Sequence, residues 1–353
     1  MLENWGWSPF FADAFAPHAS AGWVPGRVAR DHQHIYRVYA EAGEVLARVA
    51  GRLRYHADTA REYPAVGDWV ALRLLPQEHR ATIQAILPRR TRFSRKVAGE
   101  NTREQVVAAN LDTVFLAQGL DGDFNLRRLE RYLLLAWDSG ARPVIILNKA
   151  DLCEDVGSRV REVEGVAAGT PVHVMSAKLG EGLDEVQPYL APGETVALLG
   201  SSGVGKSTLI NRLLGVERLR TAEVRASDSR GRHTTTWREL ILLPNGALVI
   251  DTPGLRELQL WDGGASARSV FPDIEALAAD CHFRNCEHEQ EPRCAVRLAV
   301  QDGRLAAERL ESYVKLRREA NYLASRQDQA AQLEIKRKWR AIHRAARRHK
   351  PRV

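Results

Sequence analysis

The stretch that most constrains this chain is residues 200–207, which read GSSGVGKS. It lies between a short apolar, β-prone run at residues 195–199 and a helical pattern at residues 208–214. A glycine-rich turn between strand and helix lets backbone N–H groups surround a phosphate, and the helix N-terminus favours negative charge. The lysine of this pattern reaches the outer phosphates, and the following serine can ligate Mg²⁺. We expect a phosphate loop made of Gly200, Ser201, Ser202, Gly203, Val204, Gly205, Lys206, Ser207 and Thr208.

Two further motifs indicate the base. A carboxylate after the buried-type strand 143–147 can accept hydrogen bonds from the ring N–H and the amino group of guanine, and adenine lacks that donor pair. After a second strand at residues 171–175, a backbone N–H can meet the guanine carbonyl. We expect Lys149 to lie along the base plane and Asn148 to tie its loop to neighbouring loops. The predicted guanine site consists of Asn148, Lys149, Ala150, Asp151, Ser176, Ala177 and Lys178.

A magnesium site is expected beside the phosphates. Asp251 ends a strand and opens the motif DTPG, in which the carboxylate can hold Mg²⁺ through water and the N–H of Gly254 can sense the γ-phosphate. In the motif GRHTTT at residues 231–236, a threonine can close onto the metal, and we favour Thr235 over Thr234. The predicted ligands of the Mg²⁺ that accompanies GTP are Ser207, Thr235 and Asp251.

The order of these motifs is unusual. In Ras-like GTPases the phosphate loop comes first, whereas here NKAD and SAK precede it and DTPG comes last. From about residue 101, alternating strands and helices indicate an open, mainly parallel sheet, at whose carboxyl edge all four motifs would meet. The chain therefore resembles a circularly permuted GTPase, in which the segment after Gly254 leads directly into the C-terminal part.

The residue after the DTPG glycine bears on catalysis. Many GTPases carry a glutamine there to orient water, but this chain has Leu255, so intrinsic hydrolysis should be slow. His233 in the loop before the hairpin is the nearest candidate to position or deprotonate water. The alternative is that His233 only caps or packs its loop.

Three of the four cysteines lie close to one histidine. Three sulfurs and one imidazole make a closed tetrahedral set for structural Zn²⁺, and such clustering favours a metal over disulfides. His282 is a possible substitute ligand, and Cys153 is expected to be a core residue. The predicted zinc ligands are Cys281, Cys286, His288 and Cys294.

The N-terminal third has a β pattern. Five short runs between about residues 26 and 93 suggest a small closed barrel, for which an OB type is favoured and an SH3-like barrel is the alternative. Residues 1–20 are rich in aromatic side chains and could form a helical extension on the barrel. Residues 88–96, PRRTRFSRK, are either an exposed linker or a basic strip that contacts phosphates.

Charge is unevenly distributed. Residues 335–353 hold nine Lys or Arg and no acid, which accounts for the net charge of +7. A dense basic tail suits an RNA backbone, and a solvated terminus is the alternative. No apolar run approaches bilayer length, and the start of the chain does not resemble a signal peptide, so we expect a cytoplasmic protein without membrane contact.

Together these motifs resemble the RsgA (YjeQ) family of circularly permuted GTPases that depend on the small ribosomal subunit. The resemblance covers roughly residues 21–320 and matches Leu255 and His233 to the family pattern. It implies an N-terminal OB-type β-barrel, an α/β P-loop GTPase domain and a mainly helical C-terminal zinc domain. The expected divisions are an extension at 1–20, the barrel at 21–96, the GTPase domain at 101–262, the zinc domain at 263–325 and a basic helical tail at 326–353.

The resemblance also implies a function. We expect a monomeric GTP hydrolase that binds rRNA, acts late in small-subunit assembly and leaves after hydrolysis stimulated by that subunit. Two alternatives are a permuted GTPase that serves another RNA partner, such as the large subunit, and a GTP-gated RNA-binding module with incidental turnover.

Overall fold

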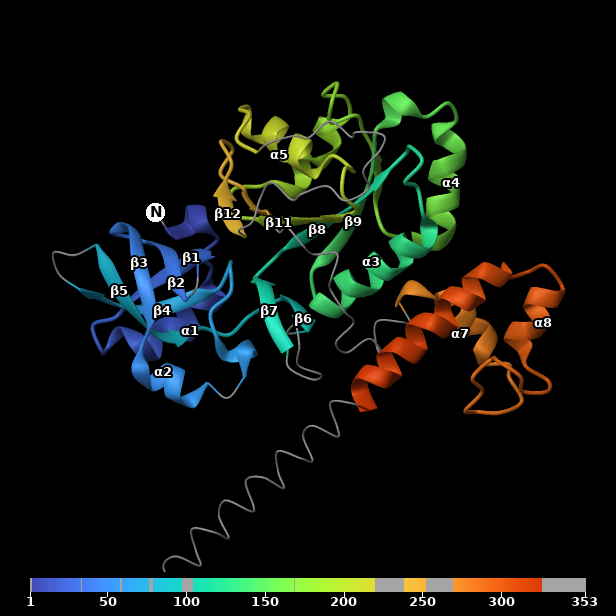
Figure 1. Ribbon diagram of the computed structural model, residues 1–353, viewed down its shortest axis with the longest axis horizontal. Helices are drawn as coiled ribbons and strands as arrows, with labels where there is room; N and C mark the ends of the chain where they lie inside the picture. The colour runs from blue at the N-terminus through green and yellow to red at the C-terminus, as the bar shows by residue number, and fades with distance from the viewer. Residues whose placement is uncertain are drawn as a thin grey trace, which may run out of the picture.

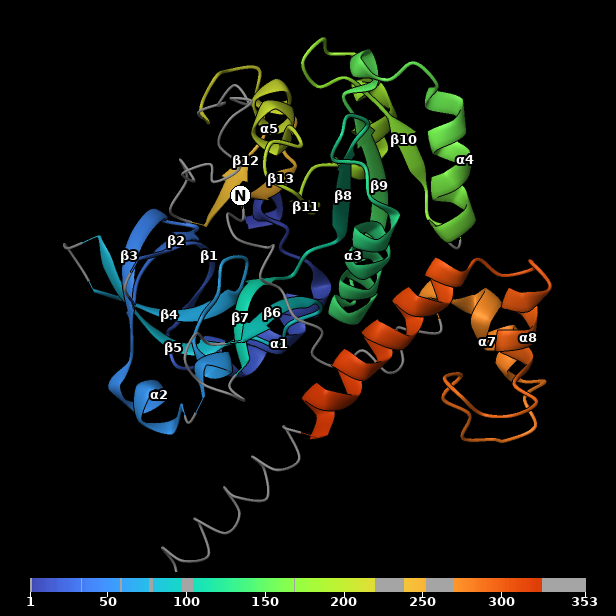
Figure 2. The same ribbon diagram turned by 45° about the vertical axis from the view of Figure 1, so that its right-hand side comes forward.

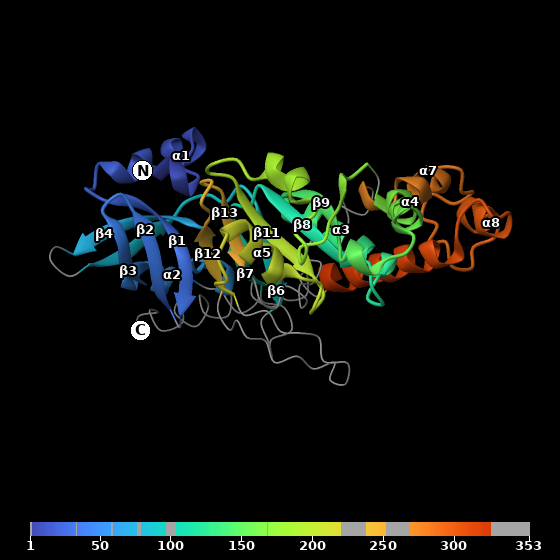
Figure 3. The same ribbon diagram turned by 90° about the horizontal axis from the view of Figure 1, so that it is seen from above.

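The computed structural model describes residues 2–32, 34–57, 59–75, 79–96, 104–167, 169–219, 238–251 and 269–325. Three parts follow one another along the chain and across the molecule (Figure 1): a barrel in blue, a sheet flanked by helices in cyan to yellow, and a helical C-terminal part in orange and red. Seen from above, the C-terminal part lies at the end remote from the barrel (Figure 3). No helix among the described residues is both long and apolar enough to cross a bilayer.

The N-terminal barrel closes on itself. Its strands are β1 (Val24–His32), β2 (Ile35–Ala40), β3 (Gly43–Val49), β4 (Trp69–Leu75) and β5 (Arg80–Ile86). They pair in the order β1-β2-β3-β5-β4, and β4 returns to β1. Only β3 and β5 run parallel, which is the Greek-key arrangement of an OB-type barrel. The OB-type prediction is confirmed, and the SH3-like alternative is wrong.

The aromatic N-terminus packs against β4 on the outside of the barrel. It forms the 3₁₀ turn η1 (Leu2–Trp5) and helix α1 (Pro9–Ala19), while α2 (Gly51–His56) and the turn η2 (Ala60–Glu62) connect β3 to β4. Phe11 and Phe15 of α1 pack with Trp69 of β4 in one buried cluster. The expected helical extension therefore packs on β4 in a cluster separate from the barrel's core.

Residues 88–96 do not form an open linker. Strands β6 (Arg92–Lys96) and β7 (Glu104–Ala109) form a hairpin between barrel and sheet, and Phe93 is only 2% exposed. Arg89 binds Asp68 through two hydrogen bonds of 2.7 Å. The other paired arginines of this segment are Arg90 with Asp112 and Arg92 with Glu104. These carboxylates hold the junction of the two domains together.

The central sheet has the predicted parallel core. Its strands are β8 (Thr113–Gly119), β9 (Arg142–Asn148), β10 (Val172–Val174), β11 (Thr195–Gly200), β12 (Glu239–Leu242) and β13 (Leu248–Asp251). The order is β10-β9-β8-β11-β13-β12, with only β12 antiparallel to its neighbour. Every residue of β8 and β11 is buried, as expected for central strands covered on both faces.

Helices cover both faces of this sheet. The core that includes α3 (Leu126–Ser139) and α4 (Val156–Ala167) lies on one face, and α5 (Lys206–Leu214) packs with the 3₁₀ turn η4 (Leu183–Tyr189) on the other. The short turn η3 (Ala150–Leu152) follows β9. Asn125 caps α3 by accepting from the N–H of Arg128, and Gly140 ends the helix in the left-handed conformation.

A buried arginine joins the barrel to the sheet. Strand β1 also pairs with β12 at Arg30 and Glu239. Arg27, 1% exposed, donates to the Trp5 carbonyl, to the Asn110 carbonyl at 3.0 Å and to Thr195 Oγ1 at 2.9 Å. Burial lowers its pKa to about 10 despite nearby Asp112. Thr195 begins the strand that leads to the phosphate loop, so Arg27 orients that strand against the barrel.

The C-terminal part packs against α3. It contains α7 (Pro272–Ala278), α8 (Ala295–Gln301) and a final helix at residues 307–325, drawn in red beside α3 (Figure 2). Glu130 of α3, fully buried, accepts from Arg309 at 2.8 Å and from the Ser312 hydroxyl. Arg131 adds a two-pronged bond to Glu319 at 2.6 and 2.8 Å. The final helix is therefore clamped to the central domain.

Candidate nucleotide site and metal centre

The phosphate loop joins β11 to α5, as predicted. Gly205 has φ +100°, and a Cβ there would lie 2.2 Å from Asn148 Nδ2, so only glycine fits. Lys206 begins α5 and turns its ammonium back over the loop. Its Nζ donates to the carbonyls of Gly200 at 2.9 Å and Ser201 at 2.6 Å. A lysine so placed marks where the outer phosphates of a nucleotide would lie.

Asn148 ties three loops together. Its Nδ2 donates to the Val204 carbonyl at 2.7 Å, and its Oδ1 accepts from the Ala177 N–H at 2.9 Å. One buried amide therefore connects the NKAD loop after β9, the phosphate loop after β11 and the SAK loop after β10. Motifs 22 or more residues apart become neighbours because the strands that precede them are parallel.

The candidate base-reading groups lie next to each other. Asp151 accepts a hydrogen bond of 2.6 Å from the Ser176 hydroxyl, which orients the carboxylate. Lys149 takes the left-handed conformation at φ +66° and places its Nζ 2.5 Å from Asp121. Arg212 of α5 donates to the Ala177 carbonyl at 3.1 Å and also to that of Lys178. Helix α5 thus holds in place the loop that would meet the guanine carbonyl.

Asp251 places a carboxylate at the same sheet edge. Its Oδ2 is buried and has no hydrogen-bond partner among the residues that the structure describes. Burial raises its pKa to about 6, while the ammonium of Lys206 opposes that rise. A divalent cation would supply the missing partner, so this position suits the predicted magnesium site. Thr235, His233 and Gly254 lie outside the described residues, as does the basic tail.

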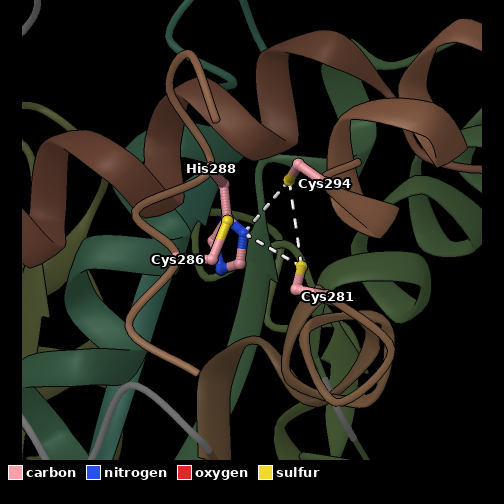
Figure 4. A group of neighbouring side chains, drawn as sticks. All are labelled: Cys281, Cys286, His288 and Cys294. Carbon is pink, nitrogen blue, oxygen red and sulfur yellow. Dashed lines mark hydrogen bonds between the residues drawn. The ribbon is translucent and has the colours of Figure 1, made fainter. Parts of the chain in front are cut away.

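The cysteine cluster is compact (Figure 4). The four predicted ligand atoms lie within 4.8 Å of one another. Tetrahedral Zn²⁺ with Zn–S near 2.3 Å requires sulfurs about 3.8 Å apart and slightly shorter S···N separations. Here Sγ of Cys281 lies 3.9 Å from that of Cys294, and Nδ1 of His288 lies 3.6 and 3.4 Å from those two sulfurs. The donor set therefore fits zinc.

The surroundings of the cluster favour a bound cation. Burial, together with the neighbouring Cys294 and Cys281 sulfurs, raises the pKa of the Cys286 thiol to about 12. Zinc would reverse this, since a coordinating thiol is deprotonated. The Arg297 N–H points to Cys294 Sγ at 3.5 Å, as sulfur ligands prefer. His282, the alternative ligand, lies outside the four-residue cluster and stacks edge-on with Phe283 instead.

Some supporting carboxylates lie outside the predicted motifs. Asp121 and Asp123 follow β8 and contact Lys149 and Ser201. Their position directly after a buried strand was a usable signal, because carboxyl ends of parallel strands meet at one edge. In the cysteine loop, Glu291 accepts from the N–H groups of Glu287 at 2.8 Å and Glu289 at 2.9 Å. That contact leaves no recognisable pattern in the sequence.

Comparison with known proteins decides the family. A family model described as RsgA GTPase matches residues 86–261. A curated relative from Opitutus terrae, named "Small ribosomal subunit biogenesis GTPase RsgA", is 50% identical over 98% of this chain and 97% of its own length. The chain belongs to the RsgA family. Another RsgA relative, from Lactiplantibacillus plantarum, is 50% identical over 90% of this chain and 89% of its own.

Solved structures agree with the RsgA fold. The crystal structure of YjeQ from Thermotoga maritima is 28% identical, with a TM-score of 0.60 over 84% of this chain and 98% of that one. YloQ, described as a circularly permuted GTPase, superposes with a TM-score of 0.56 over 85% of this chain, at 24% identity. A second family model, described as 50S ribosome-binding GTPase, matches residues 195–331. That match begins at β11, the strand that comes first in an unpermuted GTPase.

Proposed function

We propose that this RsgA-family chain hydrolyses GTP and acts late in assembly of the small ribosomal subunit, which it leaves after hydrolysis. The observation that carries the proposal is the double hydrogen bond of Asn148, which brings the NKAD, SAK and phosphate loops into one site. The names of relatives that are 50% identical over most of their length support the ribosomal role.

The proposed roles of the residues follow from position. Asp151 would read guanine, Lys149 would lie along the ring, and the SAK loop would meet the carbonyl. Lys206 and the phosphate-loop N–H groups would hold the β- and γ-phosphates. Mg²⁺ would be held by Ser207, Thr235 and Asp251, with Gly254 sensing the γ-phosphate and His233 positioning water. Zn²⁺ in the cysteine cluster would be structural.

The proposed partner is ribosomal RNA, contacted by the barrel and the C-terminal part. The barrel offers an exposed group around α2, where Tyr55 is 84% exposed beside Arg52 and Arg54. Aromatic and basic side chains of this kind suit nucleic acid. We also propose that the chain divides into an extension at 1–20, the barrel at 21–96, the GTPase domain at 101–262, the zinc domain at 263–325 and a tail at 326–353. The protein would be a monomer in the cytoplasm.

Steady-state GTP hydrolysis separates the proposal from its alternatives. It should be measured for the protein alone, with purified small subunits and with purified large subunits. We expect slow turnover alone and a rise on the order of 10³-fold with small subunits only. Stimulation by large subunits would instead favour another RNA partner. Subunit binding that requires GTP but leaves turnover unchanged would favour a GTP-gated binding module.

The catalytic residue has its own test. His233→Ala should lower subunit-stimulated turnover by about 100-fold while GTP affinity changes little, because the histidine acts on water and not on the nucleotide. Full stimulated turnover in this variant would remove His233 from the mechanism.

Base recognition is tested separately. Asp151→Asn should weaken GTP binding by roughly 100-fold or more and improve binding of xanthosine triphosphate, because the asparagine presents a donor where guanine needs an acceptor. Titration with fluorescent nucleotides measures both affinities. Unchanged GTP affinity would contradict the assignment of Asp151.

A further inference from the structure

One loop at the nucleotide edge contains none of the nucleotide-binding motifs. Strand β8 lies between β9, which ends at NKAD, and β11, which ends at the phosphate loop. Gly119 at its end is in register with Asn148, and Ala117 is in register with Gly200. Residues 119–125 therefore leave the sheet between the base side and the phosphate side of the site.

The first carboxylate of this loop holds the base-side lysine. Asp121 Oδ2 lies 2.5 Å from Lys149 Nζ, and the two side chains are 26% and 20% exposed. Burial opposes ionisation, but the hydrogen bond from Lys149 lowers the pKa of Asp121 overall, so the pair is ionic. Because Lys149 has a left-handed backbone and a long side chain, this contact limits where its methylene stem can lie.

The second carboxylate holds the phosphate loop. Asp123 accepts a hydrogen bond from the hydroxyl of Ser201, and Arg128 Nη1 binds the same carboxylate at 3.0 Å. Ser201 in turn accepts from Lys206 through its carbonyl. Asp123 therefore fixes the residue on which the phosphate-binding lysine rests.

The loop itself is anchored from outside the site. Its last residue, Asn125, caps α3, and α3 is clamped to the final helix through Glu130 and Arg309 at 2.8 Å. A carboxylate on a rigid support loses little entropy when it holds a lysine or serine, so it can pre-organise a binding site.

We infer that Asp121 and Asp123 are positioning residues of the nucleotide site: Asp121 holds Lys149 against the guanine ring, and Asp123 holds Ser201 and with it the phosphate loop. This inference rests on the proposed function. It adds the 119–125 loop to the elements that determine nucleotide affinity.

The test is a pair of double-mutant cycles on the full chain. Dissociation constants for fluorescent GDP and GTP are measured for Asp121→Asn, Lys149→Met and the double variant, and likewise for Asp123→Ala, Ser201→Ala and their double variant. We expect each Asp variant to bind both nucleotides about tenfold more weakly, and each double variant to bind no more weakly than its weaker single parent.

Controls separate positioning from folding. Glu164→Gln removes one charge from the exposed face of α4 and should leave affinity unchanged. Asp121→Glu keeps the charge that pairs with Lys149 and should restore most of the affinity lost in Asp121→Asn. Asp123→Asn keeps an oxygen that can accept from the Ser201 hydroxyl and should restore most of the affinity lost in Asp123→Ala. Melting temperatures should be equal across the series.

Each outcome has a defined meaning. Suppose that the wild-type chain binds guanine nucleotides. Unchanged affinity in Asp121→Asn and Asp123→Ala, or fully additive losses of affinity in the double variants, would then overturn this inference and leave the proposed function standing. A wild-type chain that bound no guanine nucleotide would overturn the proposed function and this inference with it.

Discussion

The nucleotide edge of the sheet and the cysteine cluster gather their side chains in opposite ways. The nucleotide edge draws on loops between residues 119 and 251, which the parallel strands and Asn148 hold together. The cluster draws on residues 281–294 alone, where three sulfurs and an imidazole face one another. The parallel sheet brings the first set of side chains together, and one short loop brings the second set together.

The two regions differ in which buried groups carry a free-energy cost in the absence of a metal. In the cluster, burial and the neighbouring sulfurs raise the pKa of Cys286, and bound zinc would remove that cost. At the nucleotide edge, within the described part of the chain, Asp251 Oδ2 and the side-chain amide of Gln118 near the end of β8 are buried without a hydrogen-bond partner. Asn148, Asp151 and Lys206 at that edge do form hydrogen bonds within the protein.

The largest expected effect follows from removing the metal. Chelation or Cys294→Ser should unfold the C-terminal part, because a structural zinc site supplies on the order of 10 kcal/mol to a small domain. Limited proteolysis should then cut within residues 269–325 and spare the central sheet. Cys153→Ser, outside the cluster, serves as the matched control. Resistance to protease after complete zinc removal would show that the C-terminal part does not depend on the metal for its stability.

A smaller effect is expected at the contact between the C-terminal part and helix α3. Arg309→Met should lower the free energy of unfolding by about 3 kcal/mol, because it leaves buried Glu130 and its neighbour Asp273 without their shared cation. Arg304→Met removes an arginine paired with Asp302 at the surface and should cost under about 1 kcal/mol. Urea denaturation compares them, and equal losses would show that the clamp carries no special weight.

The smallest expected effect has the opposite sign. Asp251→Asn should raise the free energy of unfolding by about 1–2 kcal/mol at pH 7.5 without nucleotide, because it removes a buried charge, and should abolish Mg²⁺-dependent hydrolysis. The carboxyl pKa is about 6 in the fold against an ordinary 3.8, so folding favours its protonated form. The stability gap to wild type should therefore narrow as pH falls from 6 towards 3.8.

The control for this last prediction is Asp184→Asn, an exposed carboxylate in η4. It should change neither stability nor hydrolysis. A loss of stability in Asp251→Asn would mean that the carboxylate is compensated within the fold and that the nucleotide edge stores no such cost.

Much of the fold could be predicted from local patterns of apolar residues. The apolar run at residues 143–147 predicted strand β9, and the periodic segment at residues 125–138, followed by Gly140, predicted helix α3, because burial imposes these periods on the sequence. The OB-type barrel needed more, since five alternating runs fit two barrel types. The parallel β3–β5 pairing distinguished them, and pairing between distant strands leaves no mark in either strand alone.

By itself the sequence determined which chemical groups the chain brings to a site: the phosphate loop, the NKAD and SAK motifs, and four metal donors with a fitting spacing. These follow from residue type and short spacing, which are properties of the chain. Only the tertiary structure decided how distant groups support them. Arg27 reaches Thr195, Glu130 meets Arg309, and Asp121 meets Lys149. Such contacts join segments 28 to 179 residues apart, and their partners become neighbours only when the chain is folded.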